Sequence, residues 1–534
     1  MCYYRTGLIV RMYSRLFLAS IIVVLGLAIV FLNPCPPAEW PAARSEICAA
    51  SAPLGPSSER TPAAGASTAT RIPVITSSQR AGNLPSSAMA SGPAIAPSEA
   101  FILPAGTQWI THLVKRNEGL GGIVSRYLPD SIYMRRAELE MALRQANGLE
   151  GNGLKPGAQI RIPGIPLAPI LDKPKPTPKD FVARGIYLTA YSAGSGHGLD
   201  LIRSWKEAGG NAVVFDIKDF DGEVHIPFRH AYAPTGNITI RNLPKFIHYL
   251  HSLQMHAIAR LAVFRDEHLA QSHPELAVHS RATGKPWQEN GKLVWTDPSN
   301  PDVQQYNLDL ARVAASAGAD EIQFDYVRFP AEGDQADARF AFQKDHPDWP
   351  RSRIITDFVA RAQQMLHSQG VLFSIDVFGV MAWATRVDLN HTGQNIADLA
   401  RRVDVMSPMI YPSHFFGFDG YRVPGDAPEH FISESMQRFE QATTGSGVVL
   451  RPWLQAFGWH TKTYSASYIV TQVRVARDQG GVGFLFWNAR NDYSRPFQAM
   501  PAVQAAIQTS PPAAKNLPPN ANAPTPQPRV TETK

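Results

Sequence analysis

Short apolar runs alternate with segments of helical periodicity through the second part of the chain. Eight runs are rich in β-branched and aromatic residues, as strands are: 183–191, 211–219, 256–264, 321–329, 372–378, 403–411, 448–457 and 481–488. Alternating strands and helices imply parallel strands joined by right-handed crossovers. Eight such units over about 330 residues predict an α/β fold, a (β/α)8 TIM barrel at residues 181–508.

Ionisable residues stand near the carboxyl ends of three predicted strands. In a TIM barrel these ends form the rim that carries the active site. Alternation along a strand places every second residue on the same face. This puts Asp216 and Lys218 together on the polar face of the second strand. Asp325 on the fourth strand and Asp376 on the fifth also lie opposite apolar neighbours, so we expect them to point into the barrel mouth.

Asp325 and Asp376 are the strongest candidates for catalysis. Neighbouring strands lie about 4.8 Å apart, so the two carboxyl groups are expected about 5–6 Å from each other. A retaining glycosidase has two carboxyl groups at this separation, one acting as nucleophile and the other as acid and base. A structural alternative exists for Asp325. It would form an ion pair inside the barrel with Lys218, Arg260 or Arg328.

Further residues at the predicted rim are candidates for binding a substrate. Aromatic rings offer flat surfaces on which pyranose rings stack, and polar side chains bind hydroxyl groups. The candidates are Asp216, Lys218, Tyr326, Arg328, Tyr411, Gln455, Trp487 and Asn488. No metal and no cofactor is predicted, because the histidine spacing fits no metal motif and no glycine-rich dinucleotide loop follows the first strand.

Four segments of the barrel carry a family resemblance. They are Arg184-Gly185-Ile186-Tyr187-Leu188-Thr189, Phe215-Asp216-Ile217-Lys218-Asp219, Phe324-Asp325-Tyr326-Val327-Arg328-Phe329-Pro330 and Ser374-Ile375-Asp376-Val377-Phe378-Gly379. The barrel resembles a bacterial glycoside hydrolase domain family, formerly a domain of unknown function and distantly related to the α-amylase clan. The resemblance implies a sugar-cleaving enzyme with Asp325 as nucleophile and Asp376 as proton donor.

Two residues depart from the wider amylase pattern. Gln323 stands where an arginine is usual, and Asp376 stands where a glutamate is usual. Asp216 or a loop residue therefore stays open as an alternative proton donor. The alternative function is a non-catalytic, glycan-binding barrel in which the carboxylates hold sugar hydroxyls.

Residues 104–165 form a small unit before the barrel. A strand, two helices and a second strand are predicted at residues 109–114, 122–127, 138–147 and 159–163. With the Asn147-Gly148 and Leu154-Lys155-Pro156-Gly157 turns, this order resembles a lysin-motif (LysM) module. The resemblance implies binding to glycans that contain N-acetylglucosamine, such as peptidoglycan. The alternative is a spacer of the same fold that has lost binding.

The N-terminus indicates where the barrel is located. A basic segment at residues 1–15 precedes an apolar run at residues 16–32. Seventeen helical residues are at the short end of what spans a bilayer, and positive charge before the run places the N-terminus in the cytoplasm. The run is predicted to be a transmembrane anchor or a cleaved signal. We therefore expect the barrel outside the cytoplasm, either on the inner membrane or as a secreted or periplasmic protein.

The remaining segments are poor in large apolar residues. Residues 33–103 and 509–534 are predicted to be a disordered linker and tail, and residues 166–180 a Pro-rich linker. All three cysteines precede these domains, so no disulfide or thiolate site is expected in the folded part. The formal charge of +6 comes without a long basic block, which disfavours nucleic acid as a partner. The expected partners are polysaccharide or peptidoglycan strands and the cytoplasmic membrane.

Overall fold

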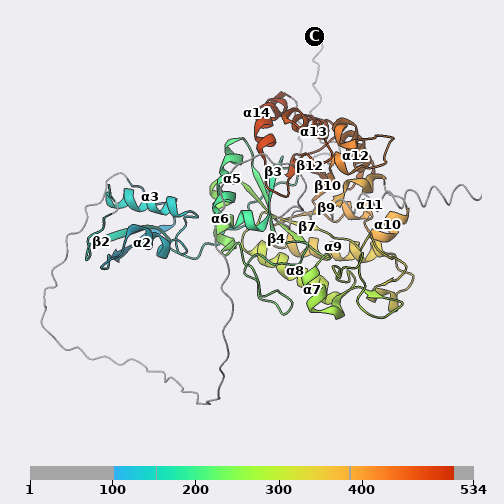
Figure 1. Ribbon diagram of the computed structural model, residues 1–534, viewed down its shortest axis with the longest axis horizontal. Helices are drawn as coiled ribbons and strands as arrows, with labels where there is room; N and C mark the ends of the chain where they lie inside the picture. The colour runs from blue at the N-terminus through green and yellow to red at the C-terminus, as the bar shows by residue number, and fades with distance from the viewer. Residues whose placement is uncertain (1–100, 152, 384–385, 510–534) are drawn as a thin grey trace, which may run out of the picture.

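Eight parallel strand positions form the closed barrel that the sequence predicts. The computed structural model describes residues 101–151, 153–383 and 386–509 (Figure 1). Seven positions hold one strand each: β3 (Arg184–Leu188), β4 (Ala212–Lys218), β5 (His256–Ala262), β7 (Glu321–Asp325), β9 (Leu372–Phe378), β10 (Val405–Ile410) and β13 (Phe484–Trp487). The eighth is divided between β11 (Val449–Leu450) and β12 (Trp453–Gln455), with Pro452, which has no N–H to donate, between them. Strand β13 pairs with β3 and β9 pairs with β10, so the sheet closes on itself.

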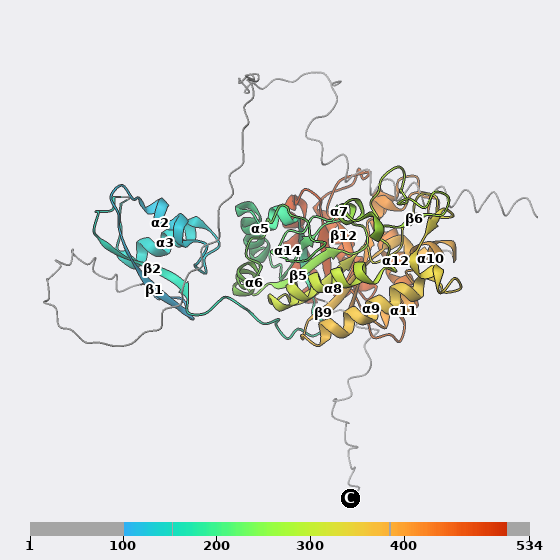
Figure 2. The ribbon, with the colours of Figure 1, turned by 90° about the horizontal axis from the view of Figure 1, so that it is seen from below.

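Helices follow the strands and cover the outside of the barrel (Figures 1 and 2). The main ones are α5 (Gly196–Glu207), α6 (Leu243–Ser252), α8 (Pro301–Ser316), α9 (Arg351–His367), α11 (Ile396–Ala400), α12 (Pro428–Thr443), α13 (Ala466–Asp478) and α14 (Ser494–Thr509). Shorter elements in the connections are α4 (Ala190–Ala193), α7 (Glu267–Ser272), α10 (Arg386–Thr392), five 3₁₀ turns (Pro274–Leu276, Ala341–Lys344, Gly379–Trp383, Pro412–His414 and Pro424–Asp426) and the antiparallel pair β6 (His279–Ser280) and β8 (Ala338–Arg339). Polar side chains cap the N-termini of three helices. The side chains of Asn242, Asn300 and Ser465 accept hydrogen bonds from N–H groups in the first turn of α6, α8 and α13, respectively.

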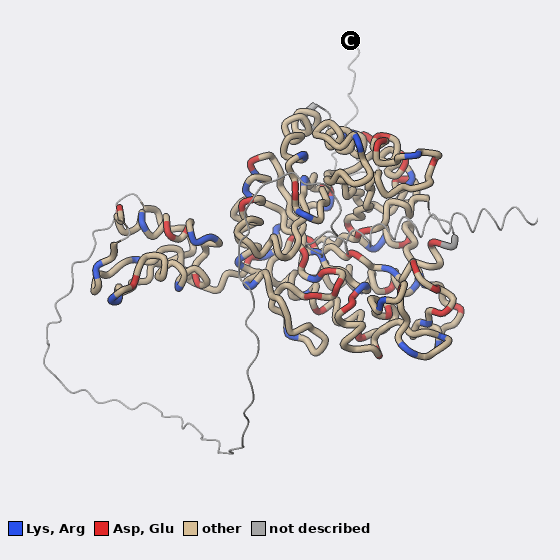
Figure 3. Tube along the Cα trace, viewed as in Figure 1, with Lys and Arg blue, Asp and Glu red and all other residues tan. Residues whose placement is uncertain are grey.

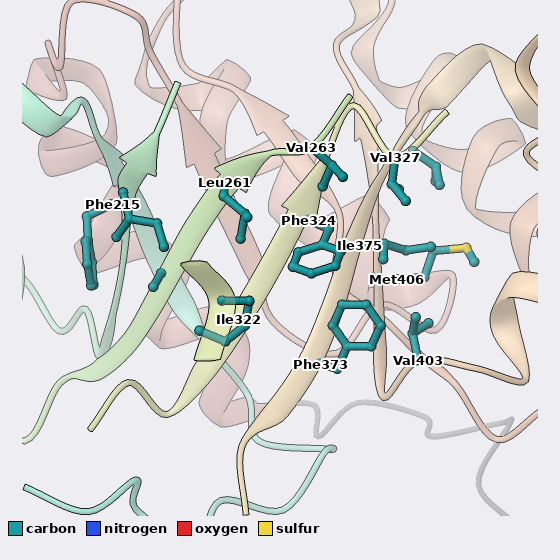
Figure 4. Packing of buried hydrophobic residues seen from close by; sticks show 14 of the residues in the cluster. Phe215, Leu261, Val263, Ile322, Phe324, Val327, Phe373, Ile375, Val403 and Met406 are labelled. Carbon is teal, nitrogen blue, oxygen red and sulfur yellow. The ribbon is translucent and has the colours of Figure 1, made fainter. Parts of the chain in front are cut away.

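The layer between strands and helices is apolar. Outward-facing side chains such as Phe215, Phe324 and Phe373 are fully buried in it (Figure 4). Phe324 stacks on Phe358 of α9 at a ring distance of 5.8 Å, and Phe215 meets Phe246 of α6 edge-on at 5.0 Å. Burying a side chain of this size contributes about 1.5–3 kcal/mol. The opposite face of each strand is therefore free to carry polar residues into the barrel.

A small antiparallel unit precedes the barrel. It contains β1 (Thr107–Leu113), α2 (Leu120–Tyr127), α3 (Arg136–Asn147) and β2 (Gln159–Pro166), in the order that its pattern predicts. Its own core consists of Val114, Leu120, Ile123, Val124, Leu139, Leu143, Ile160 and Ile162. The Asn147 amide fastens α3 to β2, because it donates to the carbonyl oxygens of Leu143 and Arg161 and accepts the Arg161 N–H.

The segment between the two units lies against the barrel. Asp172 contacts His248 Nδ1 at 2.9 Å and His251 Nδ1 at 2.7 Å, and both histidines belong to α6. The small unit also contacts α5, since Arg135 Nη1 lies 2.6 Å from Asp200 Oδ1. Basic and acidic residues are interspersed along the described part of the chain (Figure 3).

The predicted membrane segment at residues 16–32 lies outside the described residues, as do residues 33–100 of the linker and residues 510–534 of the tail. Within the ranges that the structure describes, no helix combines the length and apolar character that crossing a bilayer requires.

Candidate active site

Arg260 of β5 lies at the C-terminal rim and contacts three aspartates on neighbouring strands. Its Nη1 binds Asp216 of β4, its Nη2 lies 2.5 Å from Asp325 Oδ2 on β7, and its Nε lies 3.5 Å from Asp376 Oδ2 on β9. The structure thus brings three of the predicted site residues together around one guanidinium. If all three carboxyl groups were ionised, their negative charge would exceed the single positive charge of Arg260. This excess of negative charge favours protonation of one of the carboxyl groups.

The two candidate catalytic carboxyl groups have different surroundings. The Asp325 side chain is 10% exposed, whereas that of Asp376 is 1% exposed. Asp376 Oδ1 accepts a hydrogen bond from Trp453 Nε1 at 2.7 Å. Burial, followed by the charge of Asp325, raises the pKa of Asp376 well above its usual value. Asp376 therefore keeps its proton at pH values where an ordinary aspartate has lost it.

The backbone leaves strand geometry directly after Asp325. Tyr326 has a φ of 52°, which is rare for a bulky residue. Its N–H donates to Asp325 Oδ1 at 2.6 Å, and its ring centre lies 6.3 Å from the ring centre of Trp295. Backbone strain of this kind persists only where the surroundings impose it, as at functional sites. The turn at Tyr326 holds the Asp325 carboxylate in one orientation.

Strand β4 departs from regular alternation near its end. Its register with β5 shifts between Asp216 and Lys218. Asp216 stays at the rim, where it accepts a hydrogen bond from the Tyr187 hydroxyl. Lys218 Nζ lies 2.7 Å from Asp266 Oδ2 and 2.9 Å from Asn307 Oδ1 of α8. The predicted placement of Lys218 beside Asp216 is wrong, because the bulge turns the lysine toward α8, where it is fully buried and offers no surface to a substrate.

Aromatic rings occupy the opposite half of the rim. Tyr411, after β10, and Trp487, at the end of β13, stack with ring centres 5.6 Å apart. The ring centres of Trp487 and Tyr187 of β3 are 6.5 Å apart, and those of Trp487 and Phe457 are 5.4 Å apart. Trp487 and Phe457 are half-buried. The rim therefore has a charged half on β4, β5, β7 and β9 and an aromatic half on β10, β12, β13 and β3.

Gln455 and Asn488 hold loops together instead of lining the mouth. Gln455 Oε1 accepts the Ser413 N–H at 3.1 Å, and its Nε2 donates to the Phe457 carbonyl at 2.9 Å. Asn488 Nδ2 donates to the Ala456 carbonyl at 2.6 Å. Both residues are buried. These contacts do not fit the predicted role in substrate binding, because the polar groups already serve the protein itself.

Arg328 is buried among aromatic rings. Its guanidinium lies 4.8 Å from the ring centre of Trp295 and 4.6 Å from that of Phe378, and its Nη1 donates to the Phe329 carbonyl at 3.0 Å. It forms no ion pair with Asp325. Lys218, Arg260 and Arg328 were the predicted ion-pair partners of Asp325. In the structure, Arg260 forms this ion pair.

Two further residues near the rim were not predicted as site residues. The Tyr187 hydroxyl binds Asp216. Asp219 follows β4, and burial, then the charge of Asp216, raises its pKa to about 7.

A TIM barrel whose rim gathers carboxylates beside aromatic rings has the architecture of a glycoside hydrolase. Residues 185–493, which are 309 of the 534 residues, match the family described as "Putative glycosyl hydrolase domain". The chain belongs to this family. A comparison with curated proteins finds no match.

Several solved structures are similar to this chain. A hypothetical protein from Ruminiclostridium thermocellum ATCC 27405 is 34% identical, over 36% of this chain and 97% of that one, with a TM-score of 0.32. The glycoside hydrolase domain of PgaB (BpsB) from Bordetella bronchiseptica is 15% identical, over 61% of this chain and 97% of that one, with a TM-score of 0.46. The spore cortex-lytic enzyme SleL from Bacillus megaterium QM B1551 is 12% identical, over 73% and 85%, with a TM-score of 0.37.

Proposed function

We propose that this protein cleaves glycosidic bonds of a polysaccharide by a two-carboxylate, retaining mechanism. Asp325 is the nucleophile and Asp376 is the proton donor. The observation that supports this assignment is the difference between their surroundings. Both side chains are buried, but that of Asp325 is 10% exposed and lies 2.5 Å from Arg260, whereas that of Asp376 is 1% exposed and has a raised pKa. One ionised and one protonated carboxyl group form the pair that glycoside hydrolysis requires.

In the first step, an Asp325 oxygen bonds to the anomeric carbon while Asp376 gives its proton to the glycosidic oxygen. The bond between that carbon and that oxygen breaks, the alcohol leaves, and a covalent glycosyl-enzyme remains. In the second step, the ionised Asp376 takes a proton from water as the water oxygen displaces Asp325 from the sugar. Both carboxyl groups return to their starting states. The Arg260 charge lies beside both carboxyl groups and stabilises the negative charge of Asp376 between the steps.

The proposed substrate is a cell-envelope or extracellular polysaccharide that contains N-acetylglucosamine, such as the glycan strands of peptidoglycan. The LysM-like unit at residues 104–165 supports this choice, because its resemblance implies binding to such glycans. The apolar run at residues 16–32 supports a barrel outside the cytoplasm, anchored on the inner membrane or released if the run is cleaved. The half-buried Trp487 offers a ring on which a sugar at the carboxylates can stack.

The Asp325→Asn variant tests the proposal. The purified full-length protein is incubated with peptidoglycan, glycol chitin, amylose and xylan, and released reducing ends and product masses are measured. We expect the variant to lose activity by at least ~10²-fold on the glycan that the wild type cleaves. Asp309→Asn, on the outer helix α8, is the matched control and should retain the wild-type rate. Release at the wild-type rate by Asp325→Asn would reject the assignment, and an inverted anomer in the first product would reject retention.

A non-catalytic glycan-binding barrel is the second candidate. One observation favours it: Arg260 already contacts Asp216, Asp325 and Asp376, so these carboxylates can hold hydroxyl groups without reacting. Binding of the wild type to a glycan of the same panel, with no product from any member, would support this function instead.

A further inference from the structure

A line of neighbouring rings, which we call the aromatic track, leads outward from the rim. It consists of Trp487, Phe457, His414, Trp459 and Phe416. Consecutive ring centres are 5.4, 5.8, 5.1 and 5.7 Å apart. His414 is buried, and the other four rings are half-buried, so part of each reaches the surface.

The inner end of the aromatic track meets the carboxylate cluster. Trp487 lies 6.5 Å from the Tyr187 ring, and the Tyr187 hydroxyl binds Asp216. A ligand held at the carboxylates therefore has the track as its next surface on this side of the barrel.

The two loops that carry the outer part of the track are fastened to each other. Asp426 Oδ1 accepts the N–H groups of Lys462 at 2.7 Å and Thr463 at 3.1 Å. Gln455 joins the same loops through Ser413 and the Phe457 carbonyl. Rings held in place before binding lose little conformational entropy when a ligand arrives.

We propose that the rings of the aromatic track bind successive sugar units of one glycan chain whose scissile bond lies at Asp325. This inference rests on the proposed hydrolase function and deepens it, because it makes the substrate a chain of several units. The continuity of the track with the carboxylates favours a glycan over a protein segment as the occupant, since the glycan would be held at both. The chain length of the substrate then decides how well it is cleaved.

Trp459→Ala tests the inference, with Trp349→Ala as the matched control. Trp349 is also half-buried, but it stacks on His346 outside the track. The probes are the dimer and pentamer of N-acetylglucosamine, and the readout is the ratio of kcat/KM for pentamer to dimer. We expect Trp459→Ala to lower this ratio roughly 10-fold, the effect of one lost stacking contact of about 1.4 kcal/mol. Trp349→Ala should leave the ratio unchanged.

Pentamer binding is measured separately by tryptophan fluorescence in the Asp325→Asn background, where it does not depend on turnover. Trp459→Ala should weaken binding roughly 10-fold there as well. Absence of pentamer binding, or an equal ratio for both tryptophan variants, would overturn the inference while leaving hydrolysis of another glycan possible. Binding that depends on Trp459 without turnover of any glycan would uphold the track and overturn the hydrolase function.

Discussion

Replacing Arg260 by Met removes the only positive charge in direct contact with three rim carboxyl groups among the described residues. The methionine keeps much of the apolar stem but offers no donor to Asp216, Asp325 or Asp376. Breaking a buried ion pair by removing one partner costs about 3–5 kcal/mol, because the remaining charge stays buried without compensation. A typical domain has only about 5–15 kcal/mol of stability, so the loss is large.

The stability that Arg260→Met loses should depend on pH. Burial raises the pKa values of Asp216 and Asp376 in the folded protein, and Arg260 opposes this rise. Without Arg260 both values rise further above the unfolded value of about 4. A carboxyl group with a raised folded pKa binds more protons in the folded state, so its contribution to stability is present below about pH 4 and is lost as the pH rises through the folded pKa. We therefore expect Arg260→Met to lose more stability near pH 8 than near pH 5.

Urea unfolding followed by tryptophan fluorescence at about pH 5 and about pH 8 measures the difference. Arg184→Met is the control, because Arg184 is half-buried, its Nε donates to the Gly209 carbonyl at 2.7 Å, and no Asp or Glu oxygen lies within 4.0 Å of its nitrogens in the described part of the chain. The stability that Arg184→Met loses should not change with pH. An Arg260→Met loss that is equal at both pH values, or greater at pH 5, would refute the electrostatic reasoning.

Two further tests, with three variants, separate catalysis from stability. Asp376→Asn should lower kcat ~10²- to 10⁴-fold. It should also remove the decline of activity at high pH, because the proton donor no longer titrates. If Asp216→Asn removes that decline instead, Asp216 is the proton donor. Glu321→Gln should destabilise the fold by about 3–5 kcal/mol. It should also move the decline of kcat to lower pH, because the charge of Glu321 helps to raise the pKa of Asp376. Although burial opposes it, Arg451 lowers the pKa of Glu321 to about 2, so the wild-type contribution is present above about pH 4.5 and lost as the pH falls toward 2. Denaturant midpoints and pH–rate profiles check both.

The barrel could be predicted from the sequence because its strands are buried on the helix side by long apolar side chains. The run at residues 372–378 became β9 with the same bounds, since Phe373, Ile375 and Val377 alternate without interruption. The run at residues 448–457 did not become one strand. Arg451 and Pro452 interrupt it, and a proline between ladder positions cannot donate a backbone hydrogen bond.

The candidate site was predictable only where alternation holds. Asp376 lies within β9 and Asp325 is the last residue of β7, and both reach Arg260 at the rim. Lys218 follows a bulge, which local sequence does not reveal because it depends on the register with β5. Gln455 also occupies an inward position, but its partners lie on loops distant in the chain, such as Ser413. Alternation along a strand determines on which face a side chain lies. The residues that the side chain contacts determine its role.

The register of β5 and β7 accounts for the departure at Gln323. Arg260 is the Cα partner of Gln323 across the two strands, and its long side chain extends from there to Asp325. The guanidinium that the amylase pattern supplies from the nucleophile's own strand thus reaches the same carboxylate from the neighbouring strand. Gln323 is left to donate to Ser407 Oγ across the barrel at 3.3 Å. Arg260 thus places a positive charge beside Asp325 although position 323 is a glutamine.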